Sequence, residues 1–132
     1  MKRAGFTMIE LIFVIVILGI LSAVALPKFI GVSQQAHDQK VKSFAGTLNR
    51  TVGPSMWAKS LADGNNGVVA TAAAGLCDTK ADLLTYVDTI PPELTFSTTT
   101  PCSFDANTSA GGAKSITFVD GNATTAPKWT VN

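Results

Sequence analysis

The chain begins with a long apolar run that contains very few polar residues. Between Phe6 and Leu26 only Thr7, Glu10 and Ser22 are polar. As an α-helix rising ~1.5 Å per residue, this segment would span about 32 Å, close to the ~30 Å hydrocarbon core of a bilayer. The pattern therefore predicts a membrane-spanning helix over residues 6–26.

From Phe29 onward the pattern becomes amphipathic. Apolar residues recur at spacings of three and four, which is typical of one buried helix face. This stripe consists of Val41, Phe44, Ala45, Leu48, Val52 and Met56. Gly53-Pro54 interrupts the pattern, and Trp57 and Leu61 lie off the stripe, so we expect a bend there. The run DGNNG over residues 63–67 predicts the end of the helix.

The remaining residues predict a small β-rich domain. Residues 68–75 are weakly patterned and indicate a loop with a short strand. Thr79 to Val87 indicates a short helix, with Thr79 as N-cap and Asp82 three residues later. Four β-prone segments then follow between turn residues: LTFSTTT, CSFDA, SITFVD and KWTVN. The expected fold class is α+β, with one long N-terminal helix packed on a small antiparallel β-sheet.

Composition and charge reduce the number of possible function classes. The 132 residues suffice for one domain, and only 14% are charged, against roughly 25% in average soluble domains. The net charge of +1 argues against a nucleic-acid-binding surface, so no nucleic-acid partner is predicted. The basic residues on the amphipathic helix are interpreted as a solvated face. These residues are Lys40, Lys42, Arg50 and Lys59. His37 is interpreted as a solvated surface residue.

Two cysteines and one histidine provide few candidate ligands for a metal site and few candidates for a thiol active site. Cys77, Cys102 and His37 are too few, and wrongly spaced, for zinc. Counting leaves a catalytic Cys–His pair open, but no local motif supports it. If the domain is exported, the oxidising compartment favours a disulfide between Cys77 and Cys102.

The flanking charges predict the topology. Lys2 and Arg3 precede the apolar run, which favours a cytoplasmic N-terminus and an exported C-terminal part. Ser22 to Ala25 resembles the cleavage site of an ordinary secretory signal. The apolar run is longer than the ~7–15 residues of such a signal, and that interpretation leaves Glu10 unexplained.

Glu10 needs a partner, because a carboxylate in a membrane is costly and usually functional. A cut between Gly5 and Phe6 would create an α-amine four residues from Glu10. A neighbouring chain, shifted along its axis, could place its own amine beside this carboxylate. We expect an isolated chain to leave Glu10 poorly satisfied and packing to relieve it, so that Glu10 acts as an assembly device.

The stretch KRAGFTMIEL resembles the prepilin signature of the type IV pilin and type II secretion pseudopilin superfamily. Gly5, Phe6, Thr7 and Glu10 match that signature position by position, and Pro27 falls where the family commonly has a helix-weakening proline. The resemblance implies a pilin-like fold, cleavage after Gly5 by a prepilin peptidase and N-methylation of Phe6. It also implies assembly into a filament by an inner-membrane platform, with the helix around Pro27 unwinding in the filament.

This resemblance divides the chain into four parts. Residues 1–5 are a leader, 6–26 a transmembrane and filament-core helix, 27–63 an amphipathic helix, and 64–132 an exported domain. The chain would be a single-pass inner-membrane protein and then part of an extracellular or periplasmic filament.

Other candidate chemistry is sparse. No GxSxG, P-loop or HExxH motif occurs, so we do not expect an enzyme. Residues 105–116 begin like a calcium loop but lack its glycine and its final acid, so no cofactor is predicted and calcium is only a candidate. Asn107 and Asn122 stand in Asn-x-Ser/Thr sequons, each with an aspartate two residues earlier. They are candidate glycosylation sites, although turn residues are the favoured interpretation. Asn49 lacks that acid and lies on the predicted helix.

Three function classes remain open. The leading hypothesis is a structural subunit of a type IV pilus-like filament. Within the same family, a pseudopilin of a type II secretion or DNA-uptake machine is the alternative. From a different class, a monomeric membrane-anchored periplasmic binding module would need the apolar helix only as an anchor and should tolerate loss of Glu10.

Overall fold

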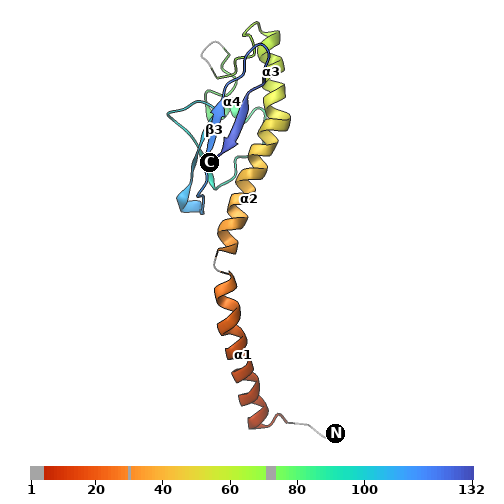
Figure 1. Cartoon of the computed structure of the whole chain (residues 1–132), viewed down its shortest axis with the longest axis vertical. Coiled ribbons are helices and arrows are strands. Elements are labelled where there is room, and N and C mark those ends of the chain that lie inside the picture. Colours follow the sequence, from red (N-terminus) through yellow and green to blue (C-terminus); the bar gives the residue numbers. More distant parts are fainter. Residues whose placement is uncertain (1–4, 30, 71–73) are drawn as a thin grey trace. The chain divides into compact units, whose positions relative to one another are not determined.

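The computed structural model describes residues 5–29, 31–70 and 74–132, and the chain forms two compact units (Figure 1). The first unit, residues 1–33, contains the helix α1 (Met8–Phe29). The second unit, residues 34–132, contains the sheet and the remaining helices, apart from the first two residues of the helix that begins at Val32. Each unit is described by itself.

Helix α1 has no buried residue. Its large apolar side chains keep between 40% (Ile17) and 78% (Met8) of their surface exposed. Pro27 lies inside its last turn, and the helix ends at Phe29. Gly31 follows with a φ of 99°, a left-handed conformation that glycine adopts without steric cost.

A second helical run comprises α2 (Val32–Thr47), a π turn η1 (Leu48–Val52) and α3 (Gly53–Ala62). The predicted apolar stripe is confirmed: Phe44 is partly buried, and the other five members are buried. The predicted interruption at Gly53-Pro54 takes the form of this π turn. The Pro54 ring would crowd the carbonyl four residues earlier, and a wider turn relieves that crowding.

The helical run ends where the sequence predicts it. Ala62 is the last residue of α3, and Asp63 occupies the C-cap position. Gly64 and Gly67 then have φ values of 79° and 78°, so the glycines of the DGNNG run supply left-handed turns.

Helix α4 (Lys80–Leu83) is shorter than predicted. Thr79 is its N-cap, and Thr79 and Asp82 form the expected capping box. The predicted extension to Val87 is wrong, because the chain leaves the helix after Leu83 through a series of turns. Helix α4 is too short to be stable alone and is held by the buried side chain of Leu83.

The four predicted strands are present, each shorter than its β-prone segment. They are β1 (Leu94–Phe96), β2 (Phe104–Ala106), β3 (Ile116–Val119) and β4 (Lys128–Val131). They form one antiparallel sheet in the order β1-β2-β3-β4. The pairs Phe96 with Phe104 and Phe118 with Trp129 set the register at its two ends. The expected α+β fold class is confirmed.

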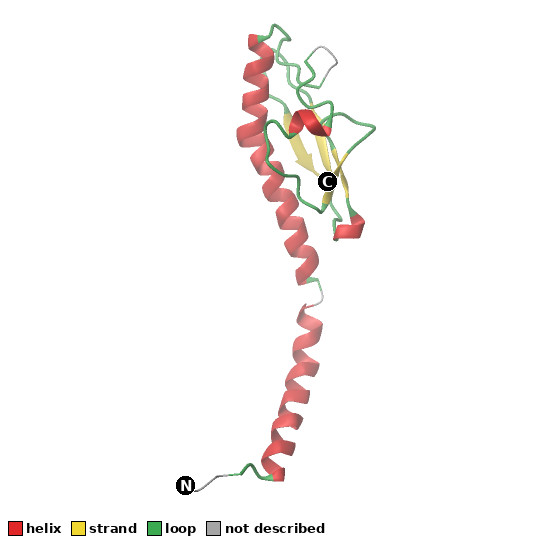
Figure 2. Cartoon of the chain, turned by 180° about the vertical axis from the view of Figure 1, so that it is seen from behind, coloured by secondary structure: helices red, strands yellow, loops and turns green. Residues whose placement is uncertain are grey.

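The sheet lies against one side of the helical run (Figure 2). Phe104 packs edge-to-face on Phe44 of α2, with ring centroids 5.4 Å apart. At the other end, a Cβ added to Gly53 would lie 3.0 Å from the ring of Trp129, so glycine permits this close approach. Apolar residues from both layers form one core.

A disulfide joins Cys77 and Cys102, as predicted. Their Cα atoms are 5.2 Å apart, and both residues are fully buried. The bond ties the segment before α4 to the turn between β1 and β2. Trp129 lies beside it, because its indole Nε1–H donates to the Cys102 carbonyl at 2.8 Å.

Candidate functional site

The first site is the N-terminus of α1, where Thr7 and Glu10 cap the helix reciprocally. The Thr7 backbone N–H and its hydroxyl each donate to Oε2 of Glu10, both at 2.8 Å. The Glu10 N–H lies 3.4 Å from the Thr7 hydroxyl oxygen. This is the arrangement of a capping box, which satisfies N–H groups that have no partner at a helix start.

The capping box corrects one expectation. The expectation that an isolated chain leaves the Glu10 carboxylate poorly satisfied is wrong for one oxygen, because Oε2 accepts two hydrogen bonds from Thr7 within the same chain. Among the described residues, no donor reaches Oε1. Thr7 therefore holds the carboxylate in place while one of its oxygens remains free for another group.

Gly5 and Phe6 lie immediately before this box, in an irregular segment outside the helix. Both are exposed, and Phe6 keeps 87% of its surface accessible. A peptide bond between two exposed residues in an irregular segment is open to a peptidase. Pro27, the remaining predicted assembly residue, lies at the opposite end of α1.

Within the described ranges, one helical segment, beginning at Met8, is long and apolar enough to cross a membrane. None of its apolar window is buried within the chain. Burial of so much apolar surface must come from outside the chain, from lipid or from other subunits.

The second site is a buried carboxylate that sequence analysis missed. Glu93, just before β1, has no exposed surface. Its Oε1 is 2.8 Å from His37 Nδ1 and 2.8 Å from Lys40 Nζ, both on α2. Its Oε2 is buried and has no partner among the described residues. The interpretation of His37 as a solvated surface residue is therefore wrong, because its ring is partly buried and binds Glu93. Lys40 is exposed, as a solvated residue should be, and also binds Glu93.

Electrostatics at this cluster favour the ionised carboxylate. The hydrogen bonds from Lys40 and then from His37 lower the pKa of Glu93 from 4.5 to about 2, against the opposing effect of burial. The ammonium of Lys40 keeps 57% of its side-chain surface exposed, so solvent retains access to one side of the cluster. The cluster fastens the segment before β1 to α2.

The two candidate glycosylation sites differ in how their side chains are used. The Asn107 amide Nδ2 donates to the Pro92 carbonyl at 2.8 Å. Asn122 is exposed, and its Oδ1 accepts hydrogen bonds from Thr124 and Thr125. Within the described part of the chain, no acceptor binds Nδ2 of Asn122, so this nitrogen remains available.

The aspartates that precede the sequons also differ. The carboxylate of Asp120 accepts the N–H groups of Val69 and Ala70 at 2.8 and 3.1 Å, and that of Gly121 at 2.7 Å. It therefore anchors a loop. Asp105 lies exposed on β2.

The candidate calcium loop contains a short helical turn. A 3-10 turn, η2 (Thr108–Ala110), follows Asn107, and Gly111 then adopts a left-handed conformation. In the described part of the chain, no group of three or more His, Cys, Asp or Glu side chains is placed to hold a metal ion.

Comparison with known proteins supports the N-terminal resemblance. Residues 1–26 match the family described as the prokaryotic N-terminal methylation motif. The type IV narrow pilus major component PilA5 of Thermus thermophilus is 46% identical to this chain over 48 residues. That match covers 36% of this chain and 41% of the relative. No solved structure matches the chain. The similarity to the type IV pilin signature is thus confirmed for the N-terminal segment.

Proposed function

We propose that this chain is a structural subunit of a type IV pilus-like filament. The observation that carries the proposal is the combination at one end of the chain: a methylation motif over residues 1–26 and an apolar helix with no buried residue. A helix of that kind needs a membrane first and neighbouring helices afterwards. The similarity to a pilus major component in Thermus thermophilus supports the same assignment.

The proposed sequence of events follows from the exposed segment before α1. A prepilin peptidase cuts between Gly5 and Phe6, and the new Phe6 amine is N-methylated. Residues 6–26 hold the chain in the inner membrane, and residues 64–132 are exported. An inner-membrane platform then moves the chain into an extracellular or periplasmic filament.

Glu10 has a defined place in this proposal. Thr7 occupies Oε2 of the carboxylate, so the amine of Phe6 in a neighbouring subunit would bind at Oε1. The carboxylate is then positioned before the neighbour arrives, which reduces the entropy lost on binding. Pro27 weakens the far end of α1, where we propose that the helix unwinds in the filament.

Two experiments test the proposal together. The mature N-terminus is measured by mass spectrometry, with methylated Phe6 as the expected first residue. Glu10→Leu is then compared with the unmodified chain for membrane content and for content in sheared filaments. Breaking a buried ion pair costs ~3–5 kcal/mol, which predicts a hundredfold or greater loss of subunit affinity at ~1.4 kcal/mol per decade. Membrane content should not fall, because the segment becomes more apolar.

The alternatives predict other outcomes. A monomeric membrane-anchored binding module would keep its function with Glu10→Leu, and a chain that starts at Leu26 or later would be an ordinary secreted protein. A pseudopilin of a secretion or DNA-uptake machine would behave like a pilin in both experiments. The neighbouring genes distinguish the pilin from the pseudopilin. They would encode a retraction motor in one case, and a secretion channel or DNA-uptake proteins in the other.

A further inference from the structure

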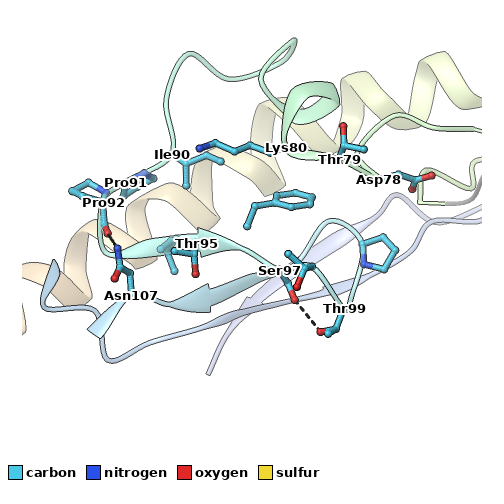
Figure 3. Close-up of a pocket in the computed structure, with 14 residues that line it drawn as sticks. Asp78, Thr79, Lys80, Ile90, Pro91, Pro92, Thr95, Ser97, Thr99 and Asn107 are labelled. Carbon is cyan, nitrogen blue, oxygen red and sulfur yellow. Dashed lines mark hydrogen bonds between the residues drawn. The ribbon is translucent and has the colours of Figure 1, made fainter. Parts of the chain in front are cut away.

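The two cysteines of the disulfide are closed off from solvent in the folded chain. Cys77 and Cys102 are each 0% exposed. A cavity of about 850 Å³ is lined by Asp78 (Figure 3) and Pro101, which are the chain neighbours of the two cysteines. Among the described residues that line this cavity, neither cysteine occurs. A thiol exchanges with a disulfide only where the reagent reaches its sulfur, so the folded chain is a poor substrate for an oxidant.

The residue that binds Cys102 from outside comes later in the chain than either cysteine. Trp129, on β4, is 2% exposed and donates its indole N–H to the Cys102 carbonyl at 2.8 Å. The Trp129 ring also approaches α3 at Gly53, where an added Cβ would lie 3.0 Å from it. The core beside the disulfide is therefore complete only after β4 has docked on the helix.

The backbone of Cys102 favours the same order of events. Its φ is 59°, in the left-handed region that residues other than glycine rarely adopt. Such a conformation costs free energy and persists only where the surrounding structure imposes it. In the reduced chain, no covalent bond to Cys77 holds Cys102 in place. The native turn between β1 and β2 is therefore less stable before oxidation than after it.

We propose that the disulfide forms before β4 docks, by thiol–disulfide exchange between the unfolded chain and a protein that carries an oxidising disulfide. The proposal rests on the export of residues 64–132, which is part of the proposed function. A chain exported from its N-terminal anchor presents Cys77 first, then Cys102 and then Trp129. Both thiols thus reach the oxidising compartment before the residue that completes their burial.

The exchange has two steps, in which atoms and electrons balance. The Cys77 thiolate attacks one sulfur of the oxidant's disulfide, and the other sulfur of the oxidant leaves as a thiolate. The Cys102 thiolate then attacks Sγ of Cys77, which forms the Cys77–Cys102 bond and releases the second thiolate of the oxidant. The chain loses two electrons, which reduce the oxidant. The two protons of the cysteine thiols end on the thiols of the oxidant.

This order gives the oxidation a fixed place among the reactions of the chain. A dithiol oxidation has to act on the chain during export, before residues 34–132 fold and before any assembly. Folding afterwards buries the bond, which protects it from reductants as well as from further exchange. A chain that folds before oxidation remains reduced for much longer, because its thiols react only when the fold opens.

The order is tested with the full chain in detergent micelles. The chain is reduced in urea at a concentration that unfolds residues 34–132, freed of reductant and divided in two. One half receives oxidised glutathione in urea, and the other half receives it after return to urea-free buffer. Free thiols are trapped and counted by mass spectrometry over time, and tryptophan fluorescence reports whether the reduced chain has folded. Failure of the proposed function would appear at the mature N-terminus and in filaments, which this experiment does not involve.

We expect the folded reduced chain to oxidise at least about tenfold more slowly than the chain in urea, because its thiols react only after opening. If the reduced chain does not fold, oxidation has to come first, which supports the same order. Equal rates in urea and in a folded reduced chain would overturn the proposal. Ala58→Cys in the oxidised chain is the control for the reagent: this position is exposed, so its thiol should react at similar rates in both solutions.

The part played by β4 is tested in a reduced chain that folds. The side-chain amide of Asn49 binds the carbonyl and the N–H of Trp129. Asn49→Ala should therefore open β4 more often and speed oxidation of the folded reduced chain about fivefold or more. Arg50→Ala, an exposed neighbour, should leave the rate unchanged. Equal rates for Asn49→Ala and Arg50→Ala would show that docking of β4 does not close the thiols off, and the proposed order would be wrong.

Discussion

Asn49, on the π turn of the helix, forms two hydrogen bonds with the backbone of Trp129 and so takes the place of a missing strand beside β4. Its Nδ2 donates to the Trp129 carbonyl at 2.7 Å, and its Oδ1 accepts the Trp129 N–H at 2.8 Å. Trp129 is 2% exposed and also binds the Cys102 carbonyl through its indole. Helix, sheet and disulfide therefore meet at one residue.

We expect Asn49→Ala to lower the free energy of unfolding by ~1–3 kcal/mol, because two buried backbone groups lose their partners. Asn49→Asp should cost at least as much, since it keeps an acceptor for the N–H but places a carboxylate against the carbonyl. Denaturant unfolding of the full chain in micelles, followed by tryptophan fluorescence, measures both. Arg50→Ala, an exposed neighbour, is the control and should stay within ~0.5 kcal/mol. A similarly small change for Asn49→Ala would show that the pair does not hold the sheet edge.

The Glu93 cluster predicts a specific pH dependence. The pKa of Glu93 in the folded chain is about 2, below its ordinary value of 4.5, chiefly because of hydrogen bonds from Lys40 and His37. A carboxylate whose pKa is lower in the folded state than in the unfolded state stabilises the fold. This stabilisation is complete at pH values above the pKa of the unfolded state. As the pH falls from about 4.5 toward 2, the unfolded state takes up the proton first, and this stabilisation is lost. Stability should therefore decline with acid over that window.

Glu93→Gln isolates this contribution from the other carboxylates. At neutral pH the variant should be less stable by ~1–3 kcal/mol, because hydrogen bonds to a charged group are replaced by weaker ones. Between pH 4.5 and 2 the free energy of unfolding of the variant should change less with pH than that of the unmodified chain. Unfolding is measured at several pH values for both chains. Parallel curves would mean that Glu93 is not the group that titrates.

Most of the fold could be predicted because its signals are local. The apolar stripe depends on spacings of three and four, and the Thr79–Asp82 capping box on a spacing of three. Glu93 and Asn49 had no such signal. Glu93 binds residues 56 and 53 positions away, and the Asn49–Trp129 separation is 80. Only the packing of helix on sheet brings these groups together.

The contact missed at the N-terminus is of the opposite kind, because it is local. The pattern around Glu10 predicts an assembly residue that binds a partner from another chain. Thr7, three residues away, already provides two donors. The signal was present, since Thr-x-x-Glu before an apolar run is a capping-box sequence.

Reduction of the disulfide should destabilise the second unit, residues 34–132. Cys77 and Cys102 enclose a separation of 25 residues. In the chain-entropy description, a loop of this size contributes ~3–4 kcal/mol by restricting the unfolded chain. The double variant Cys77→Ser with Cys102→Ser should lose about that amount in denaturant unfolding. A loss below ~1 kcal/mol would contradict a structural role.

If either sequon carries a glycan, we expect it at Asn122 rather than at Asn107. The Asn107 amide nitrogen is bound to the Pro92 carbonyl, whereas Asn122 is exposed and its nitrogen has no acceptor among the described residues. Glycopeptide mass spectrometry of filaments from the native host measures both sites. Asn122→Gln should remove any added mass and Asn107→Gln should not. Carbohydrate at Asn107 contradicts this expectation, and carbohydrate at neither site supports the interpretation as turn residues.

Thr7 should affect assembly through Glu10. Thr7→Val keeps the backbone N–H that binds Oε2 but removes the hydroxyl, so both the helix cap and the carboxylate lose one contact. Loss of an N-cap hydroxyl typically costs ~1 kcal/mol, which corresponds to roughly a fivefold change in affinity. Filament incorporation should therefore fall about that much, well short of the loss expected for Glu10→Leu. Thr7→Ser, which keeps the hydroxyl, is the matched control and should assemble normally. Each tagged variant is co-expressed with the unmodified chain, and its share in filaments is divided by its share in the membrane. If Thr7→Val and Thr7→Ser give the same ratio, the capping box does not prepare Glu10 for its neighbour.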